Sequence, residues 1–182
     1  MTRLRMLAVA GGLLFMACSP PLVADSGERN WYVAAGGGVL HFEGGDNTGQ
    51  AAVTLGRKLP YRHQQTPRSN IALELEVTRT TSAVSRRIDG ERRDVDVTTG
   101  SGWMALNTYV GERFFHRTRL GLLYRHLDPE GRSSRSQGRI GFGMGAGFVL
   151  TPRLEVLADA SVQYWGTADL AAAGTVAGRF YF

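Results

Sequence analysis

Apolar residues recur at every second position in eight separate segments of this chain, and this period restricts the fold more than any other feature. In residues 140–150, apolar side chains stand at every even position and glycines at four of the odd ones. A period of two places the two sets on opposite faces of a β-strand, whereas an α-helix would mix them. The sequence therefore predicts an all-β chain with strands at residues 30–42, 49–58, 70–80, 100–113, 118–127, 140–150, 154–165 and 175–182.

The connections between these predicted strands alternate in length. Residues 44–47, 82–97, 128–138 and 166–174 form long or polar connections, whereas 115–117 and 151–153 are tight. The segment 59–69 is the exception, because it is long where a tight turn is expected. Alternating short turns and long loops are typical of up-and-down antiparallel barrels in membranes.

The first 24 residues have the composition of an export signal. Arg3 and Arg5 precede an apolar stretch at residues 6–17, and Ala24 supplies a small residue for cleavage. We therefore expect a signal peptide at 1–24 and one barrel domain at 25–182. No other run approaches the ~18 apolar residues of a transmembrane helix, so a membrane form of this chain requires a barrel.

Cys18 is the only cysteine, so no internal disulfide is expected. The segment Leu14-Phe15-Met16-Ala17-Cys18 resembles a loose lipobox, in which Cys18 would become the lipidated first residue of a lipoprotein. In the alternative, Cys18 is discarded with the signal peptide.

The chain ends on an aromatic strand with Val176, Phe180 and Phe182 on one face. This ending resembles the carboxy-terminal signature of Gram-negative outer-membrane barrels, which implies recognition by the barrel-assembly machinery. Strand number, loop asymmetry and this ending together resemble the small barrels that include the OmpA transmembrane domain and the opacity-type surface proteins. The resemblance implies an eight-stranded antiparallel transmembrane β-barrel in the cell outer membrane.

Aromatic residues predicted near strand ends would form interfacial girdles; these are Trp31, Tyr109, Phe114, Phe115, Tyr164, Trp165, Phe180 and Phe182.

Charged residues share the strand faces that lie opposite the apolar ones. Eight candidate lumen residues follow from this alternation: Glu74, Glu76, Arg119, Arg125, Arg139, Glu155, Asp159 and Arg179. Buried charges are costly unless they are paired, and the interior of an eight-stranded barrel is just wide enough for side chains to fill. We expect these groups to pair across a plugged lumen. A narrow porin for ions or small solutes is the alternative, as is a soluble lipocalin-like lipoprotein with its apolar faces inward.

The sequence offers no catalytic, cofactor or metal site. The glycines of 141–147 lack the lysine and the following helix of a phosphate-binding loop. Lipid A-modifying outer-membrane enzymes use a His and a Ser two residues apart on a lipid-facing strand, but Asp128 stands two residues after His126, and Ser136 is predicted in a loop. We therefore expect no enzyme activity, with lipid A modification as an alternative.

The chain is basic, with 21 Lys and Arg against 16 Asp and Glu. Arginines cluster in the predicted loops 82–97 and 128–138, where they favour phosphates of lipopolysaccharide or an anionic extracellular ligand. Aromatic residues do not interleave with them as in single-stranded nucleic-acid sites, so no nucleic-acid partner is expected. The predicted role is structural or interactive, through loops outside the cell.

Overall fold

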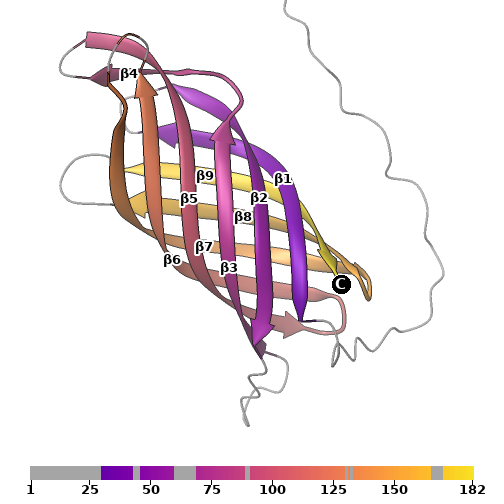
Figure 1. The fold of residues 1–182 in the computed structure, drawn as a ribbon. Helices are drawn as coiled ribbons and strands as arrows, with labels where there is room; N and C mark the ends of the chain where they lie inside the picture. The colour runs from indigo at the N-terminus through magenta and orange to yellow at the C-terminus, as the bar shows by residue number, and fades with distance from the viewer. Residues whose placement is uncertain are drawn as a thin grey trace, which may run out of the picture.

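The chain folds into one antiparallel sheet that closes on itself as a barrel (Figure 1). The computed structural model describes residues 30–42, 46–59, 69–88, 91–129, 131, 133–164 and 170–182. Its strands are β1 (Trp31–Phe42), β2 (Asn47–Leu59), β3 (Ser69–Thr80), β4 (Val84–Ile88), β5 (Glu91–Val110), β6 (Phe114–Pro129), β7 (Arg135–Thr151), β8 (Leu154–Tyr164) and β9 (Ala171–Tyr181). The described residues contain no helix long and apolar enough to cross a bilayer.

Two pairings close the barrel. β1 pairs with β9 from Tyr32↔Tyr181 to Phe42↔Ala171. β3 pairs with β5, so β4 stands outside the ring and pairs with β5 alone. Eight strands therefore form the barrel, as the sequence predicted. Closure gives each of the eight barrel strands a neighbour on both edges, which a sheet in lipid requires.

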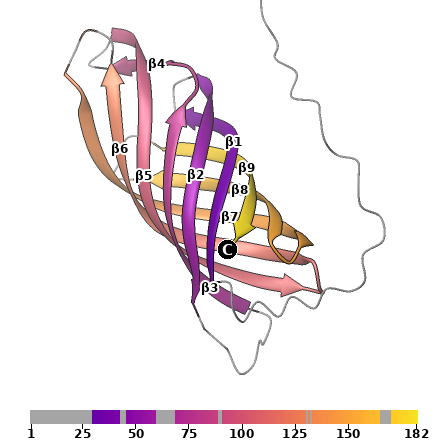
Figure 2. The same ribbon diagram turned by 45° about the vertical axis from the view of Figure 1, so that its right-hand side comes forward.

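The two ends of the barrel differ. At one end, here called the turn end, residues 111–113 and 152–153 connect β5 to β6 and β7 to β8, and Gly111 has a φ of 78° in the first turn. At the opposite end, the loop end, β4 and the first part of β5 project past the other strands (Figure 2). The 59–69 connection lies largely outside the described residues.

Apolar side chains point outward and charged side chains point inward. Phe142, Met144 and Phe148 are 48%, 60% and 43% exposed, whereas Glu74 is 3% exposed. In β6, inward and outward positions alternate without a break over its 16 residues. This orientation excludes the lipocalin-like alternative, which required the apolar faces inside. An apolar outer belt around a polar interior is the arrangement that a bilayer stabilises.

The structure corrects the predicted strand limits at both ends of the barrel. The predicted loop 82–97 contains β4 and the start of β5, and the predicted tight turn 115–117 lies within β6. At these points the polarity pattern reverses: Val84, Val95 and Val97 are buried inside, while Asp94 and Asp96 face out. Sheet that extends beyond the bilayer needs a polar exterior, so the pattern that predicted the membrane strands does not continue there.

Two predicted girdle aromatics are also wrong. Phe115 is fully buried inside the barrel, and Tyr109 packs against it with ring centroids 5.0 Å apart. Trp31, Phe114, Tyr164, Phe180 and Phe182 do face outward, and Arg57 lies 5.3 Å from the centroid of the Trp31 ring. Trp165 lies outside the described residues.

Candidate functional site in the barrel lumen

Eight ionised side chains form a continuous chain of alternating charge across the middle of the lumen. They come from β2, β3, β6, β8 and β9, and each faces inward because it occupies the parity opposite the apolar belt. In order of contact they are Lys58, Glu155, Arg179, Glu74, Arg117, Asp159, Arg119 and Glu76. Four acids and four bases alternate, so the formal charges in this chain cancel.

Glu74 lies near the middle of this chain of charges. Its carboxylate accepts hydrogen bonds from Tyr32 Oη and from Arg117 Nη2. Arg179 Nη2 also donates to Glu74 Oε1 over 3.3 Å. Glu74 comes from β3, whereas Arg117 and Arg179 come from β6 and β9. One carboxylate therefore links three strands that lie apart in the sheet.

Arg179 connects Glu74 to the charged residues nearer the turn end. Its Nη1 donates to Glu155 Oε2 over 3.0 Å, and the Tyr181 hydroxyl donates to the same oxygen over 2.8 Å. Lys58 Nζ lies 3.7 Å from Glu155 Oε1. Charge-assisted hydrogen bonds of this kind offset the cost of removing ions from water.

The other half of the chain lies closer to the loop end. Arg117 Nε lies 3.4 Å from Asp159 Oδ2, and Arg119 Nη1 lies 3.9 Å from the same oxygen. Arg119 Nη1 also donates to Glu76 Oε2 over 3.1 Å. Trp103 Nε1 donates to the other Glu76 oxygen over 3.1 Å.

Aromatic rings cover the cations of this network. Arg179 lies 4.4 Å from the Tyr32 ring centroid, Arg119 lies 4.3 Å from that of Trp103, and Lys58 lies 4.0 Å from that of Tyr181. Cation–π contacts strengthen where water is excluded. The inward glycines make room for these rings: a Cβ at Gly121 would lie 2.5 Å from the Trp103 ring.

Two buried apolar clusters lie next to the charged chain. Toward the turn end, Phe115, Val149 and Leu157 pack together. Toward the loop end, a larger cluster is buried, composed of Leu40, Phe42, Val84, Val95, Val97, Leu127, Ala171 and Ala173. Between the charged side chains a cavity of about 20 Å³ remains, lined by Glu74, Arg117 and Asp159 among others. That volume is close to the space that one water molecule needs.

The structure brings six of the eight predicted lumen residues into this chain and places two apart from it. Arg125 Nη2 donates to Gln163 Oε1 nearer the loop end, and the Arg125 guanidinium lies 5.0 Å from the Phe42 ring centroid. Arg139 Nη2 donates to Gln137 Oε1 over 2.7 Å. Both arginines are buried inside the barrel.

Sequence reasoning missed Lys58 and Arg117. Arg117 shares the parity of Arg119, but it falls in the segment predicted as a turn. Lys58 shares the inward parity of Thr54, which is buried on the same strand. Extending the 118–127 strand by one residue at its turn end would have identified Arg117. Lys58 already lay within the predicted strand 49–58, on its inward face, and applying the same alternation to that strand would have identified it.

The terminal residues have the predicted orientation. Val176, Phe180 and Phe182 are 59%, 45% and 59% exposed on the outer face. The Phe182 backbone N–H donates to the Trp31 carbonyl over 3.1 Å, so the last residue is attached to the first barrel strand. The predicted signal peptide at 1–24 and Cys18 lie outside the described residues.

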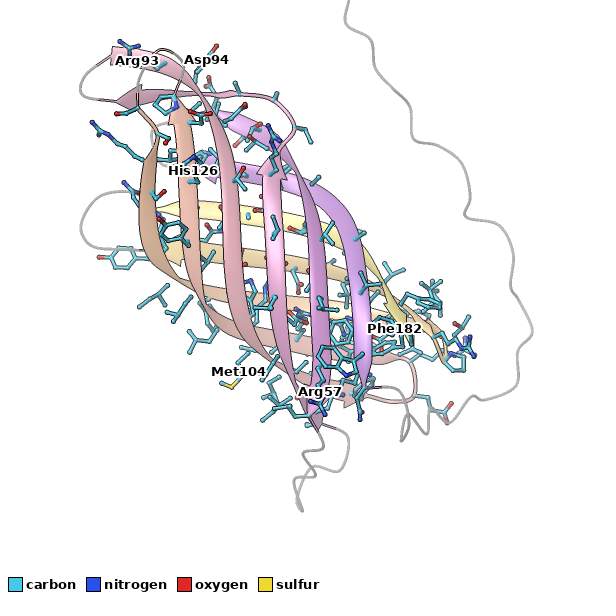
Figure 3. The ribbon with its side chains drawn as sticks, viewed as in Figure 1. Arg57, Arg93, Asp94, Met104, His126 and Phe182 are labelled. Atoms are coloured by element: carbon cyan, nitrogen blue, oxygen red, sulfur yellow. The ribbon has the colours of Figure 1, made fainter. Side chains whose placement is uncertain are left out.

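His126 and Ser136 form a hydrogen-bonded pair on the outer surface. Ser136 lies in β7 and not in a loop, directly opposite His126 in the register. His126 Nδ1 lies 3.0 Å from Ser136 Oγ. Figure 3 shows His126, Arg93 and Asp94 in the half of the barrel toward the loop end, whereas Arg57, Met104 and Phe182 lie toward the turn end.

No protein-family model matches this chain, and no curated protein matches it. Solved structures do match. Ail, the attachment invasion locus protein of Yersinia pestis, is 15% identical with a TM-score of 0.57, over 85% of this chain and 98% of Ail. Neisserial surface protein A is 15% identical with a TM-score of 0.59, over 84% of this chain and 97% of that protein. The outer-membrane enzyme PagL is 11% identical with a TM-score of 0.53, over 82% and 98%.

The protein has the fold of the small eight-stranded outer-membrane barrels. The matches span nearly the whole length of each solved chain. This fold and the apolar outer belt together support the predicted location in the outer membrane.

Proposed function

We propose that this protein is a non-catalytic outer-membrane barrel whose lumen is closed to solutes and whose loop end acts outside the cell. The observation that supports closure best is the alternating chain of eight charges across the lumen, and the cavity between these side chains has a volume of about 20 Å³. The apolar cluster toward the loop end would add a further barrier to hydrated ions.

Conductance tests the closed lumen against the narrow-porin alternative. The purified barrel, reconstituted into planar bilayers, is expected to give no stable single-channel currents. A general porin in the same bilayers serves as the positive control. Large, stable currents, or swelling of liposomes in an isotonic sugar solution, would contradict closure.

The β4–β5 hairpin supports an interaction role at the loop end. Its register places Arg86 opposite Arg93 and Arg87 opposite Arg92. This short hairpin therefore carries four arginines at paired backbone positions, and such a concentration of basic residues favours an anionic partner. Ail has been solved in complex with the heparin analogue sucrose octasulfate, with 15% identity and a TM-score of 0.53 to this chain. We infer that phosphates of lipopolysaccharide or a sulfated extracellular ligand bind here.

Binding of sucrose octasulfate to the barrel in nanodiscs tests this role. Replacing Arg86, Arg87, Arg92 and Arg93 by Gln should abolish binding, and salt should weaken it because exposed charges are screened. Arg57→Gln, at the turn end, is the matched control. Equal binding by the hairpin variant and by wild type would contradict the inference.

A second candidate function, lipid modification, is favoured by the His126–Ser136 pair. A hydroxyl within hydrogen-bond reach of an imidazole is the arrangement of an activated nucleophile. PagL, one of the similar folds, is an enzyme. If this candidate is correct, expression of the protein will change the acyl chains of lipid A, and Ser136→Ala or His126→Ala will abolish that change. Unchanged lipid A mass spectra with wild type would exclude it.

A further inference from the structure

Two outward glycines of β5, Gly100 and Gly102, have no internal steric reason to be glycine. A Cβ at Gly100 would have no neighbour within 4 Å, and one at Gly102 would meet only Leu75 Cδ2 at 4.0 Å. The inward Gly141 differs, because its Cβ would lie 2.4 Å from the Trp103 ring. The space over Gly100 and Gly102 therefore opens toward the membrane.

Large apolar side chains on the neighbouring strands form walls beside these glycines. The register places Gly100 between Val77 and Tyr124, and Gly102 between Leu75 and Leu122. All four wall residues are more than half exposed, so they stand out from the sheet. We call this hollow over β5 the outer groove.

The outer groove is large and apolar. Its upper part has a volume of about 610 Å³. It shares Leu55, Leu75, Gly102 and Leu122 with a second hollow of about 800 Å³, which reaches Trp31 and Leu59 near the turn end. Each volume lies within the range of about 300–1,000 Å³ that is common for small-molecule sites. The groove therefore runs along the membrane-facing side of β3, β5 and β6.

A polar and basic row lies at the loop end of the outer groove. The register aligns Arg79 with Thr98, Thr98 with His126, and His126 with Ser136 across four strands. All four side chains face outward. Arg79, Thr98 and His126 lie two residues nearer the loop end than Val77, Gly100 and Tyr124 on the same strands. Figure 3 shows His126 well separated from Met104, which lines the lower hollow. Arg57 lines the lower hollow near the turn end, but between it and the basic row the groove is apolar. An apolar stretch that leads to a basic row matches the order of acyl chain and phosphate in a phosphorylated lipid.

We propose that the outer groove binds one acyl chain of an outer-leaflet lipid whose phosphate lies against the Arg79–His126 row. The bilayer supplies such a chain at this depth, and the glycines allow it to approach the backbone of β5. The row supplies a guanidinium and an imidazole for an anionic headgroup. The proposal holds whether or not the lumen conducts, and it requires no catalysis by His126 and Ser136.

Photo-crosslinking tests the acyl-chain part of the proposal. The barrel is placed in nanodiscs that contain phosphatidic acid with a diazirine in one acyl chain, and the crosslinked peptides are mapped by mass spectrometry. We expect crosslinks to concentrate on β3, β5 and β6. In Gly100→Leu/Gly102→Leu they should fall to the level of the opposite side, because leucines fill the groove without an internal clash.

Gly174→Leu/Gly178→Leu is the matched control. These outward glycines of β9 also have nothing within 4 Å of an added Cβ, and β9 lies four strands from β5 in either direction around the barrel. This variant should keep the wild-type crosslinks over β5. Crosslinks spread evenly around the wild-type barrel, or unchanged by leucines at 100 and 102, would overturn the proposal.

Headgroup preference tests the basic row. Wild type should crosslink to phosphatidic acid more than to phosphatidylcholine with the same acyl chain. Arg79→Gln should abolish that preference while the crosslinks stay over β5, whereas Arg153→Gln, on the exposed turn between β7 and β8, should retain it. Equal labelling by the two lipids in wild type would overturn the assignment of the phosphate to this row.

Discussion

At the scale of single residues, Glu74 is the most consequential side chain of the lumen. Glu74→Ala leaves Arg117 and Arg179 buried without a shared carboxylate, and losing one partner of a buried pair costs about 3–5 kcal/mol. We expect a loss of this size in the free energy of unfolding, measured with urea in micelles. Glu112→Ala, on the exposed turn after β5, is the control and should change it little. Equal losses in the two variants would show that Glu74 is not coupled to its partners.

Single residues also show what could and could not be predicted from the sequence. A period of two is local, so it was sufficient to put Glu74, Glu155 and Arg179 on the inner face. Which acid meets which base depends on register and strand tilt, which no short segment specifies. Arg125 illustrates the limit: it shares the inward parity, yet its hydrogen bond goes to Gln163.

At the scale of elements, β9 closes the barrel by pairing with β1 and also carries the expected assembly signal. Replacing Phe180 and Phe182 by Ser should lower the amount of folded barrel in cells, because we expect these rings to be read during assembly. The same variant refolded in detergent should lose little stability, since both rings face outward. Heat-modifiable migration on gels measures the folded fraction in each case. Equal losses in cells and in detergent would indicate a purely structural role.

The elements that sequence reasoning misplaced share one cause. Alternation continues through residues 94–97, but its polarity reverses, with Val95 and Val97 inside and Asp94 and Asp96 outside. Prediction from alternating apolar residues that face lipid detects only the parts of a strand that lie inside the bilayer. The start of β5 and the whole of β4 therefore resembled a loop in the sequence.

At the scale of the whole molecule, this reversal marks the depth of the membrane. On β3, β5 and β6, the outward residues in the middle of the belt are apolar up to the row of Val77 and Tyr124, and they are polar from the row of Arg79 and Thr98 onward. Leu120→Arg, near the middle of the belt, should cost about 2–4 kcal/mol of folding free energy in bilayers. Thr98→Arg should cost about 0–1 kcal/mol. Equal costs for the two arginines, from denaturant titrations in liposomes, would show that Leu120 does not face hydrocarbon.

The alternating order of charges in the lumen also restricts how this protein can evolve. Reversing or removing one member leaves its neighbours facing the wrong sign, so a single change is penalised whereas a compensated exchange is tolerated. Among relatives of this chain, the residues at positions 74 and 117 should therefore covary, as should those at 155 and 179. Interiors that drift in such coupled steps can diverge in composition while the number of strands stays constant.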